Sequence, residues 1–214
     1  MEKRFYGQFD PPVDKVIYER YFPNKLNGIS IECGAYDGVF ENCTKFFEEN
    51  FNWTTINIEP LNNVYENLII NRPTSINMNI ALSNVNGIET IKNYCHPTFG
   101  YNWGNASINH TPEHKQCLEQ LCSNIYLEQS IQTMTYCELI KHININSLDL
   151  FVLDVEGYEL EVLEGMINCD VLPDVFVIEH GHNSVNFCQE ALDKLNGKYI
   201  LDHVSHVNSF YIKV

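Results

Sequence analysis

Four carboxylates stand at or beside the end of a short apolar run: Glu32, Glu59, Asp154 and Glu179. Such runs are typical of buried strands in a parallel sheet, and the carboxyl ends of parallel strands meet at one edge, where ligands bind. Carboxylates gathered there would repel one another unless something basic, metallic or cationic lies among them. One acid alone could cap the helix that follows it, but the four together predict a shared binding site.

The first of these runs, Ile29–Cys33, leads into a turn that contains Gly34 and Gly38. Glycine permits a positive φ, and it lets a ligand approach the backbone with no Cβ in between. The carboxylates of Glu32 and Asp37 would repel a phosphate, but they suit a ligand with a cationic or hydroxyl-rich face. We therefore interpret the turn as a cofactor turn and not as a phosphate cradle.

Glu59 ends the second run about 20 residues after the glycine turn, the spacing at which an acid binds the ribose hydroxyls of an adenine cofactor. This feature alone is compatible with an adenine dinucleotide and with S-adenosylmethionine. The turn reads Gly34-x3-Gly38 and lacks the G-x-G-x-x-G pattern of dinucleotide sites. Its acids suit the amino group and sulfonium of S-adenosylmethionine better than a pyrophosphate, so the methyl donor is favoured.

The elements that must position these residues alternate between strands and helices. This alternation, with short connections, predicts an α/β fold with a doubly wound parallel sheet. The expected strands are 29–33, 53–59, 76–82, 148–154 and 174–179, followed by a closing pair at 200–204 and 210–214. The expected helices are 44–50, 62–71, 135–142, 159–166 and 186–195.

We expect the whole chain, 1–214, to form one domain, because no repeat or linker interrupts it. Residues 1–27 are a lead-in with a helix after the Asp10-Pro-Pro turn. Residues 84–134 are an insertion that serves as a lid or a substrate region. It is expected to contain a hairpin across Asn86-Gly87, a long loop at 94–110, a helix at 111–121 and a strand at 125–134.

Two aromatic residues of the long loop, Tyr101 and Trp103, are candidate substrate contacts. They could stack on a sugar or cover the cofactor, or they could simply pack the loop down, and the sequence does not separate these roles. His110 and His114 have helical spacing, but Pro112 lies between them and no third ligand is evident. A surface pair is therefore the favoured interpretation of these histidines.

Composition excludes some classes of partner. The formal net charge is −15 with only 13 basic residues, which argues against binding to nucleic acid or an anionic membrane. The eight cysteines form no C-x-x-C pair and several lie in apolar runs, so reduced thiols are expected. The first residues carry no signal-like apolar run, and no stretch approaches a membrane span, so the expected location is cytoplasmic.

Four segments in order, 31–44, 56–72, 79–87 and 148–166, resemble the FkbM-type methyltransferases, which use S-adenosylmethionine. The most specific is LDLFVLDVEGYELEVLEGM, which is similar to an Asp-x-Glu-Gly-x-Glu-x-x-x-Leu-x-Gly signature. The resemblance implies a class I methyltransferase fold: a Rossmann-like three-layer sandwich whose mostly parallel, seven-stranded sheet has an antiparallel last strand. One departure is Leu153, where the family often has Lys, and this weakens a substrate assignment by analogy.

The resemblance also implies the activity: transfer of a methyl group from S-adenosylmethionine to a hydroxyl of a glycan or small metabolite. A nicotinamide-dependent oxidoreductase on a similar fold and a non-catalytic binding module are the alternatives. The cofactor-binding residues expected are Glu32, Gly34, Ala35, Tyr36, Asp37, Gly38, Asn42, Glu59, Pro60, Ala81 and Asp154.

An alkyl hydroxyl is a poor nucleophile, so a base or a metal ion should assist removal of its proton. His180 is the first candidate base because histidine has the most convenient pKa, although it could instead cap the next segment. Asp154 and Glu156 are the other catalytic candidates, and Glu179 and His182 are candidate substrate contacts. A Mg²⁺ or Mn²⁺ site built on Asp154 and Glu179 with a nearby His or Asn183 is possible but not favoured.

Overall fold

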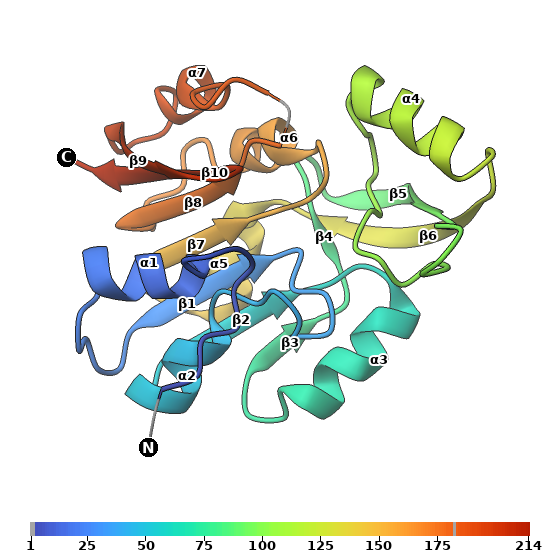
Figure 1. Cartoon of the computed structure of the whole chain (residues 1–214). Helices are drawn as coiled ribbons and strands as arrows, with labels where there is room; N and C mark the ends of the chain where they lie inside the picture. Colours follow the sequence, from blue (N-terminus) through green and yellow to red (C-terminus); the bar gives the residue numbers. More distant parts are fainter. Residues whose placement is uncertain (1–2, 182) are drawn as a thin grey trace.

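The computed structural model describes residues 3–181 and 183–214. Its main sheet contains seven strands, which are β1 (Ile29–Cys33), β2 (Thr54–Ile58), β3 (Ile76–Met78), β7 (Leu150–Leu153), β8 (Val175–Glu179), β9 (Tyr199–Ser205) and β10 (Asn208–Lys213). The strand order is β3-β2-β1-β7-β8-β10-β9 (Figure 1). The first five strands of this order pair in parallel, and β10 is antiparallel to both of its neighbours. The expected mostly parallel sheet with an antiparallel last strand is confirmed.

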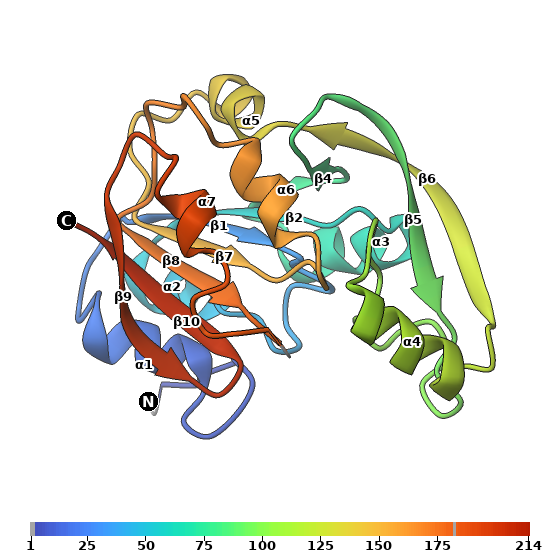
Figure 2. The ribbon, with the colours of Figure 1, turned by 90° about the horizontal axis from the view of Figure 1, so that it is seen from above.

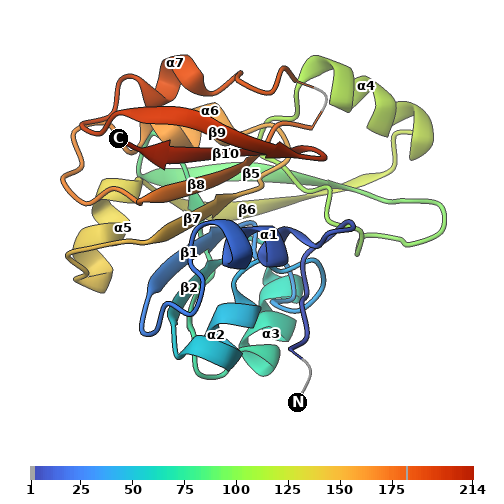
Figure 3. The ribbon, with the colours of Figure 1, turned by 60° about the vertical axis from the view of Figure 1, so that its left-hand side comes forward.

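The strands carry apolar residues on both faces, so helices must cover both. One face packs against α5 (Tyr136–Ile143), α6 (Glu159–Glu164) and α7 (Gln189–Leu192), and the other packs against α1 (Val13–Arg20) and α2 (Lys45–Phe51). Figures 2 and 3 show these two layers of helices on opposite sides of the sheet, with α3 (Asn62–Asn71) near its β3 end.

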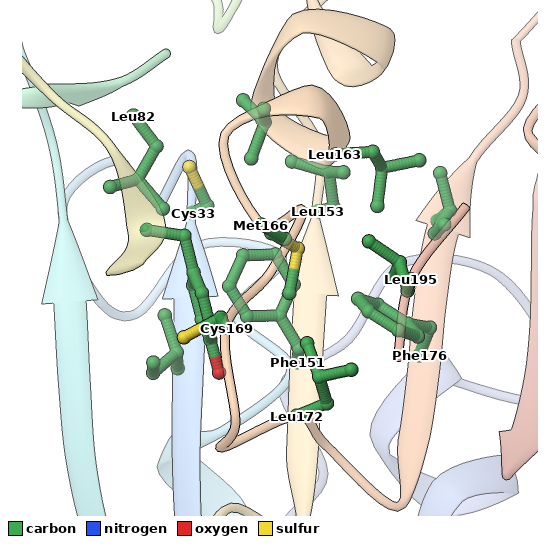
Figure 4. Packing of buried hydrophobic residues seen from close by; sticks show 14 of the residues in the cluster. Cys33, Leu82, Phe151, Leu153, Leu163, Met166, Cys169, Leu172, Phe176 and Leu195 are labelled. Atoms are coloured by element: carbon green, nitrogen blue, oxygen red, sulfur yellow. The ribbon is translucent and has the colours of Figure 1, made fainter. Parts of the chain in front are cut away.

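The larger core cluster lies beneath α5, α6 and α7. In Figure 4, Phe151 of β7 and Phe176 of β8 lie close to Leu163 and Met166 from the α6 segment. The two phenylalanine rings meet edge to face, with centroids 5.7 Å apart. This packing fixes α6 on the sheet and thereby fixes the β7–α6 connection, which carries Asp154 and Glu156.

A second, three-stranded sheet has the order β4-β6-β5. Its strands are β4 (Ala81–Leu82), β5 (Gly87–Tyr94) and β6 (Tyr126–Met134), and α4 (Pro112–Leu121) lies between β5 and β6 in the chain. Figures 1 and 2 show that this sheet and α4 lie beyond the carboxyl ends of the parallel strands of the main sheet. The insertion therefore forms a wall beside the ends of the main strands.

Two sequence expectations for this region were wrong. The hairpin across Asn86-Gly87 does not form, because β5 pairs antiparallel with β6, which follows it only after the long loop and α4. The strand expected at 76–82 is divided: β3 joins the main sheet and β4 joins the second sheet. A change of partner at Asn79 depends on long-range pairing, which local residue patterns do not encode.

The remaining elements lie close to their expected positions, and α7 is much shorter than the 186–195 helix that the sequence suggests. All eight cysteines are free thiols. Among the helices of the described residues, none is both long and apolar enough to cross a membrane.

A close backbone contact joins the glycine turn to the β7–α6 connection. Gly34 adopts φ +89°, and a Cβ at this position would lie 1.8 Å from the carbonyl oxygen of Asp154. The Asp154 amide donates a hydrogen bond to the Cys33 carbonyl at 3.1 Å. Only glycine therefore allows β1 and β7 to end side by side, and this sets where the Asp154 side chain emerges.

We predict that Gly34→Ala lowers the free energy of unfolding by at least about 3 kcal/mol, because it combines a strained φ with a backbone clash. Gly100→Ala is the matched control, since Gly100 has φ +65° but a Cβ added to it would have no neighbouring atom within 4 Å. The control should lose only about 1–2 kcal/mol in urea denaturation. Equal losses in the two variants would show that the contact with Asp154 is unimportant.

Candidate functional site

A cavity of about 440 Å³ lies at the carboxyl ends of the main parallel strands. One side is formed by the segments that follow β1, β2, β7 and β8, and the other by β5 and residues 99–108. Seven of its lining residues belong to the glycine turn, the Glu-Pro segment and the strand-end acids: Gly34, Tyr36, Glu59, Pro60, Asp154, Glu156 and Glu179. Ala81, Tyr101 and Trp103 also line it. The structure thus brings most of the sequence candidates to one cavity.

Glu59 follows β2 and is held by the backbone on either side of it. Its Oε1 accepts a hydrogen bond from the Leu61 amide at 2.8 Å, and its Oε2 accepts one from the Tyr36 amide at 3.2 Å. The residue is only 6% exposed, and burial raises the pKa of its carboxyl to about 8. The carboxyl is therefore fixed in orientation at the cavity wall, with lone pairs left for hydroxyl donors of a ligand.

Glu32 does not line this cavity. Its carboxylate accepts hydrogen bonds from the amides of Cys43 and Thr44 at 2.7 and 3.1 Å and from the Thr44 hydroxyl at 2.5 Å. Side chains alternate along a strand, so Glu32, inside β1, points to the face opposite its neighbour Cys33, towards the start of α2. Of the four strand-end acids expected at one site, three therefore line the cavity. Glu32 instead holds the segment before α2.

Four other cofactor candidates also lie behind the cavity wall: Ala35, Asp37, Gly38 and Asn42. The Asp37 carboxylate accepts hydrogen bonds from the amides of Val39 and Phe40, both at 2.8 Å, and these bonds close the glycine turn on itself. The Asn42 side-chain oxygen accepts a hydrogen bond from the Lys45 amide, at 2.8 Å, at the start of α2. These residues shape the turn, and direct contact with a cofactor stays a prediction for each of them.

Arg72, at the end of α3, holds the whole turn from behind. Its side chain is fully buried and donates to the Gly38 carbonyl at 3.1 Å, the Asn42 side-chain oxygen at 2.9 Å and the Thr55 hydroxyl at 2.9 Å. It also pairs with Glu48 at 2.5 Å. The one sequence signal for its role is its position at the close of the 56–72 family-like segment.

The other end of the cavity is acidic. Carboxylate oxygens of Asp154, Glu156 and Glu179 all lie within 4.8 Å of one another. Burial and mutual repulsion raise the pKa of Asp154 and of Glu156 well above the usual range, and burial raises the pKa of Glu179 to about 7. Asp154 is nevertheless exposed to water inside the cavity.

His180 lies on a second, smaller cavity of about 140 Å³. Glu156 and Glu179 line both cavities and so form the partition between them. Burial lowers the pKa of His180, which favours the neutral imidazole. The structure therefore places the expected base behind the acids and not on the main cavity. His182, the other histidine candidate, lies outside the described residues.

The loop after β5 covers the main cavity and is tied down by specific hydrogen bonds. The Trp103 indole donates to the Tyr94 carbonyl at 2.8 Å, and the Asn93 amide nitrogen donates to the Tyr101 carbonyl at 2.9 Å. Asn93 lines the cavity, and its side-chain oxygen is buried without a hydrogen-bond partner. A buried acceptor without a donor is costly, so this oxygen is suited to a donor group on a ligand.

Some lining residues gave no signal in the sequence. Asn93 lies in a strand whose pairing was misassigned, and Gln8 belongs to the lead-in, yet both line the cavity with Glu41 and Tyr158. A bridge between Gly7 and Glu41 brings the lead-in to the glycine-turn segment.

The pair His110 and His114 is not a surface pair. His110 is buried, its Nε2 lies 2.7 Å from the Asn105 carbonyl oxygen, and its ring meets that of His114 edge to face. Burial lowers the pKa of His110 to about 4, so its imidazole is neutral.

A parallel sheet of this order, closed by an antiparallel strand and carrying an acid at the end of β2, defines a Rossmann-like domain of the methyltransferase class. The methyltransferase FkbM domain model matches residues 32–205. The chain therefore belongs to the FkbM methyltransferase family.

The fold is similar to that of a solved structure, the methyltransferase FkbM from Methylobacillus flagellatus KT. The TM-score is 0.51 at 13% identity, with 88% of this chain and 44% of that chain covered. The present chain thus spans less than half the length of that protein. No curated protein matches the chain.

Family membership implies S-adenosylmethionine as cofactor, and the residues of the main cavity fit it. Its ribose hydroxyls and amino groups are hydrogen-bond donors, whereas the Glu59 carboxyl and the unpartnered Asn93 oxygen are acceptors on the cavity wall. None of the described lining residues is Lys or Arg, so the cationic sulfonium meets no like charge there.

The raised pKa of Glu59 makes stability depend on pH. In the unfolded chain the carboxyl loses its proton near 4.5, whereas the folded protein retains it to about pH 8. We expect the contribution of Glu59 to stability to be fully present below the lower value and to be lost as the pH rises through this window.

Glu59→Gln should reduce this pH-dependent loss in the free energy of unfolding by roughly 2–4 kcal/mol. Urea unfolding at several pH values between the pKa of the unfolded chain and that of the folded protein measures the difference. Glu138→Gln, on the exposed side of α5, is the control and should leave the profile unchanged. An identical slope in wild type and Glu59→Gln would show that the Glu59 carboxyl does not retain its proton.

Proposed function

We propose that this chain is an S-adenosylmethionine-dependent O-methyltransferase that acts on a hydroxyl of a neutral glycan or small metabolite. The observation that carries this proposal is the continuous cavity that joins Glu59 to the three clustered acids. Glu59 is suited to the ribose of the cofactor, which supplies an electrophilic methyl group when bound. The acids stand where an acceptor hydroxyl would be bound and deprotonated.

The chemistry of the cavity supports a neutral acceptor. Among the described lining residues there is no Lys or Arg to bind a phosphate, sulfate or carboxylate of a substrate. Tyr101, Trp103 and Phe99 offer aromatic faces, and Asn102 offers an amide. Aromatic faces for the apolar side of a sugar and amides for its hydroxyls are a combination suited to polyhydroxylated ligands.

His180 is proposed as the group that takes up the proton. The Ser209 hydroxyl donates to the Val185 carbonyl at 2.6 Å, so Ser209 Oγ is available as an acceptor for His180 Nδ1, 3.0 Å away. The neutral imidazole then carries its proton on Nδ1, and Nε2 has a free lone pair on the second cavity. A proton from the main cavity would reach it through Glu179 or Glu156, which line both cavities.

Glu59→Ala should weaken binding of S-adenosylhomocysteine by about 10–100-fold, because it removes the acceptor of the two ribose hydroxyls and each hydrogen bond contributes about 0.5–1.5 kcal/mol. Isothermal titration calorimetry measures the affinity, and circular dichroism checks that the fold persists. Glu138→Ala is the surface control. Unchanged affinity would place the ribose elsewhere, and binding of NAD(H) in place of the methyl-donor product would favour an oxidoreductase.

His180→Ala should lower turnover by about 100-fold or more and leave the affinity for S-adenosylhomocysteine within about twofold of wild type. Turnover is measured as S-adenosylhomocysteine released across a panel of neutral saccharides and hydroxylated metabolites. His142→Ala, at an exposed position in the last turn of α5, controls for loss of a histidine. Unchanged turnover in His180→Ala would remove His180 as the base, and cofactor binding without turnover by wild type would favour a binding module.

A further inference from the structure

Two phenylalanines at the mouth of the main cavity are largely exposed to solvent. Phe40 follows the glycine turn and Phe99 belongs to the loop after β5, and they are 61% and 63% exposed although both line the cavity. A single exposed apolar side chain is common on protein surfaces and needs no function. Two aromatic rings from the two sides of one cavity mouth form a surface suited to the apolar face of a ligand.

Both rings are supported by neighbouring side chains. The Phe40 ring meets that of Tyr36 edge to face, with centroids 6.3 Å apart. The Phe99 ring stacks on that of His96, with centroids 4.8 Å apart. His96 Nδ1 also accepts hydrogen bonds from the Thr98 and Phe99 amides at 3.0 and 3.2 Å. The rings are therefore positioned before a ligand arrives, which reduces the entropy that binding would cost.

A polar pair lies at the same mouth. Gln8 and Glu41 are exposed and line the cavity, and the Gln8 side chain donates a hydrogen bond to the Glu41 carboxylate. Burial raises the pKa of Glu179 to about 7, and the nearby Glu41 carboxylate is one of the charges that raise it further. The pair thus lies within electrostatic reach of the acidic end of the cavity. Glu41 adopts φ +54°, an unfavourable conformation of the kind found at ligand-binding sites.

The lead-in that carries Gln8 is fixed to the rest of the fold. The buried Asp14 carboxylate accepts hydrogen bonds from the Tyr6 and Gly7 amides at 2.6 and 3.1 Å. The Val13 amide donates to the Gln8 carbonyl at 3.1 Å. Gln8 therefore stands at the cavity mouth because the backbone on both sides of it is held.

The size of the cavity places most of an acceptor at this mouth. S-adenosylmethionine is itself a drug-sized ligand, and cavities for one such ligand occupy about 300–1,000 Å³. The main cavity, at about 440 Å³, is near the lower limit. It has room for the cofactor and for the reacting hydroxyl, so the remainder of the acceptor must contact the residues at the mouth.

We propose that Phe40, Phe99 and the Gln8–Glu41 pair form the acceptor subsite, and that the acceptor is a neutral saccharide unit. This inference rests on the proposed methyl transfer and narrows its acceptor. A sugar ring presents apolar C–H faces, which pack on aromatic rings, and hydroxyl groups at its edge, which the amide and the carboxylate bind. The charge of Glu41 disfavours an acidic sugar at the same place.

Methylation assays on variants of the mouth test this subsite. Turnover is measured as S-adenosylhomocysteine released, with a panel of neutral oligosaccharides, the corresponding uronic acids, and simple aliphatic and aromatic alcohols. Phe40→Ala and Phe99→Ala should each raise the KM for the best neutral saccharide by about 5–10-fold and leave kcat within about twofold of wild type. Phe40→Tyr keeps the ring and should retain the wild-type KM.

Two further variants sharpen the test. Glu41→Gln removes the charge and should reduce the preference for a neutral saccharide over its uronic acid by about threefold. Ile70→Ala removes a 73% exposed apolar side chain from α3, away from the cavity, and is the control that should leave KM unchanged. Circular dichroism checks folding, and the affinity for S-adenosylhomocysteine should stay within about twofold of wild type in every variant.

The outcomes separate this subsite from the proposed function. Saccharide KM values that the phenylalanine variants leave unchanged would overturn the subsite while methyl transfer stands. Turnover by wild type only with uronic acids, or only with the simple alcohols, would do the same. Failure of wild type to bind S-adenosylhomocysteine, or to methylate any acceptor in the panel, would instead overturn the proposed function and the subsite with it.

Discussion

The architecture of the cavity depends on a buried cation. Arg72 joins the glycine turn, the start of α2 and strand β2 through hydrogen bonds to Gly38, Asn42 and Thr55, and Glu48 balances its charge. The aliphatic stem of Arg72 also occupies the space that a Cβ on Gly38 would need. Because the turn is held in this way from behind, its Tyr36 amide can meet the Glu59 carboxyl on the cavity side. Losing the guanidinium would remove the cation that pairs with the half-buried Glu48 carboxylate and leave the acceptors of Gly38, Asn42 and Thr55 without this donor.

The acidic side chains near the cavity have two different roles, either binding backbone amides or lining the cavity. The carboxylates of Glu32, Asp37 and Glu159 accept hydrogen bonds from backbone amides, and these bonds hold the connections that follow β1 and β7. The acids on the cavity keep lone pairs for a ligand, and burial raises their pKa values. No basic side chain among the described residues lines that space to lower them again. The same residue type therefore builds the scaffold in one place and forms the binding surface in another.

Much of the architecture followed from local patterns. Continuous apolar runs such as Leu150–Leu153 form the buried central strands, and Thr135, as a capping residue, begins α5 as expected. The prediction of a hairpin at Asn86-Gly87 was wrong, because a two-residue turn competes with pairing to a distant strand. That distant strand, β6, pairs with β5 at eight positions. Side-chain direction within a strand decided the position of Glu32, since a shift by one residue moves a side chain to the other face of the sheet.

The sequence alone determined most of the order of strands and helices, the glycine turn and the acids at the strand ends, because these depend on residue type and on spacing along the chain. It also carried the resemblance to the FkbM methyltransferases, which the family match bears out. Only the tertiary structure decided which acids meet. It turned Glu32 towards α2, placed Glu156 beside Asp154 and Glu179, set His180 behind them and brought Asn93 to the cavity. Those relations depend on packing between elements far apart in the chain, and no local pattern records them.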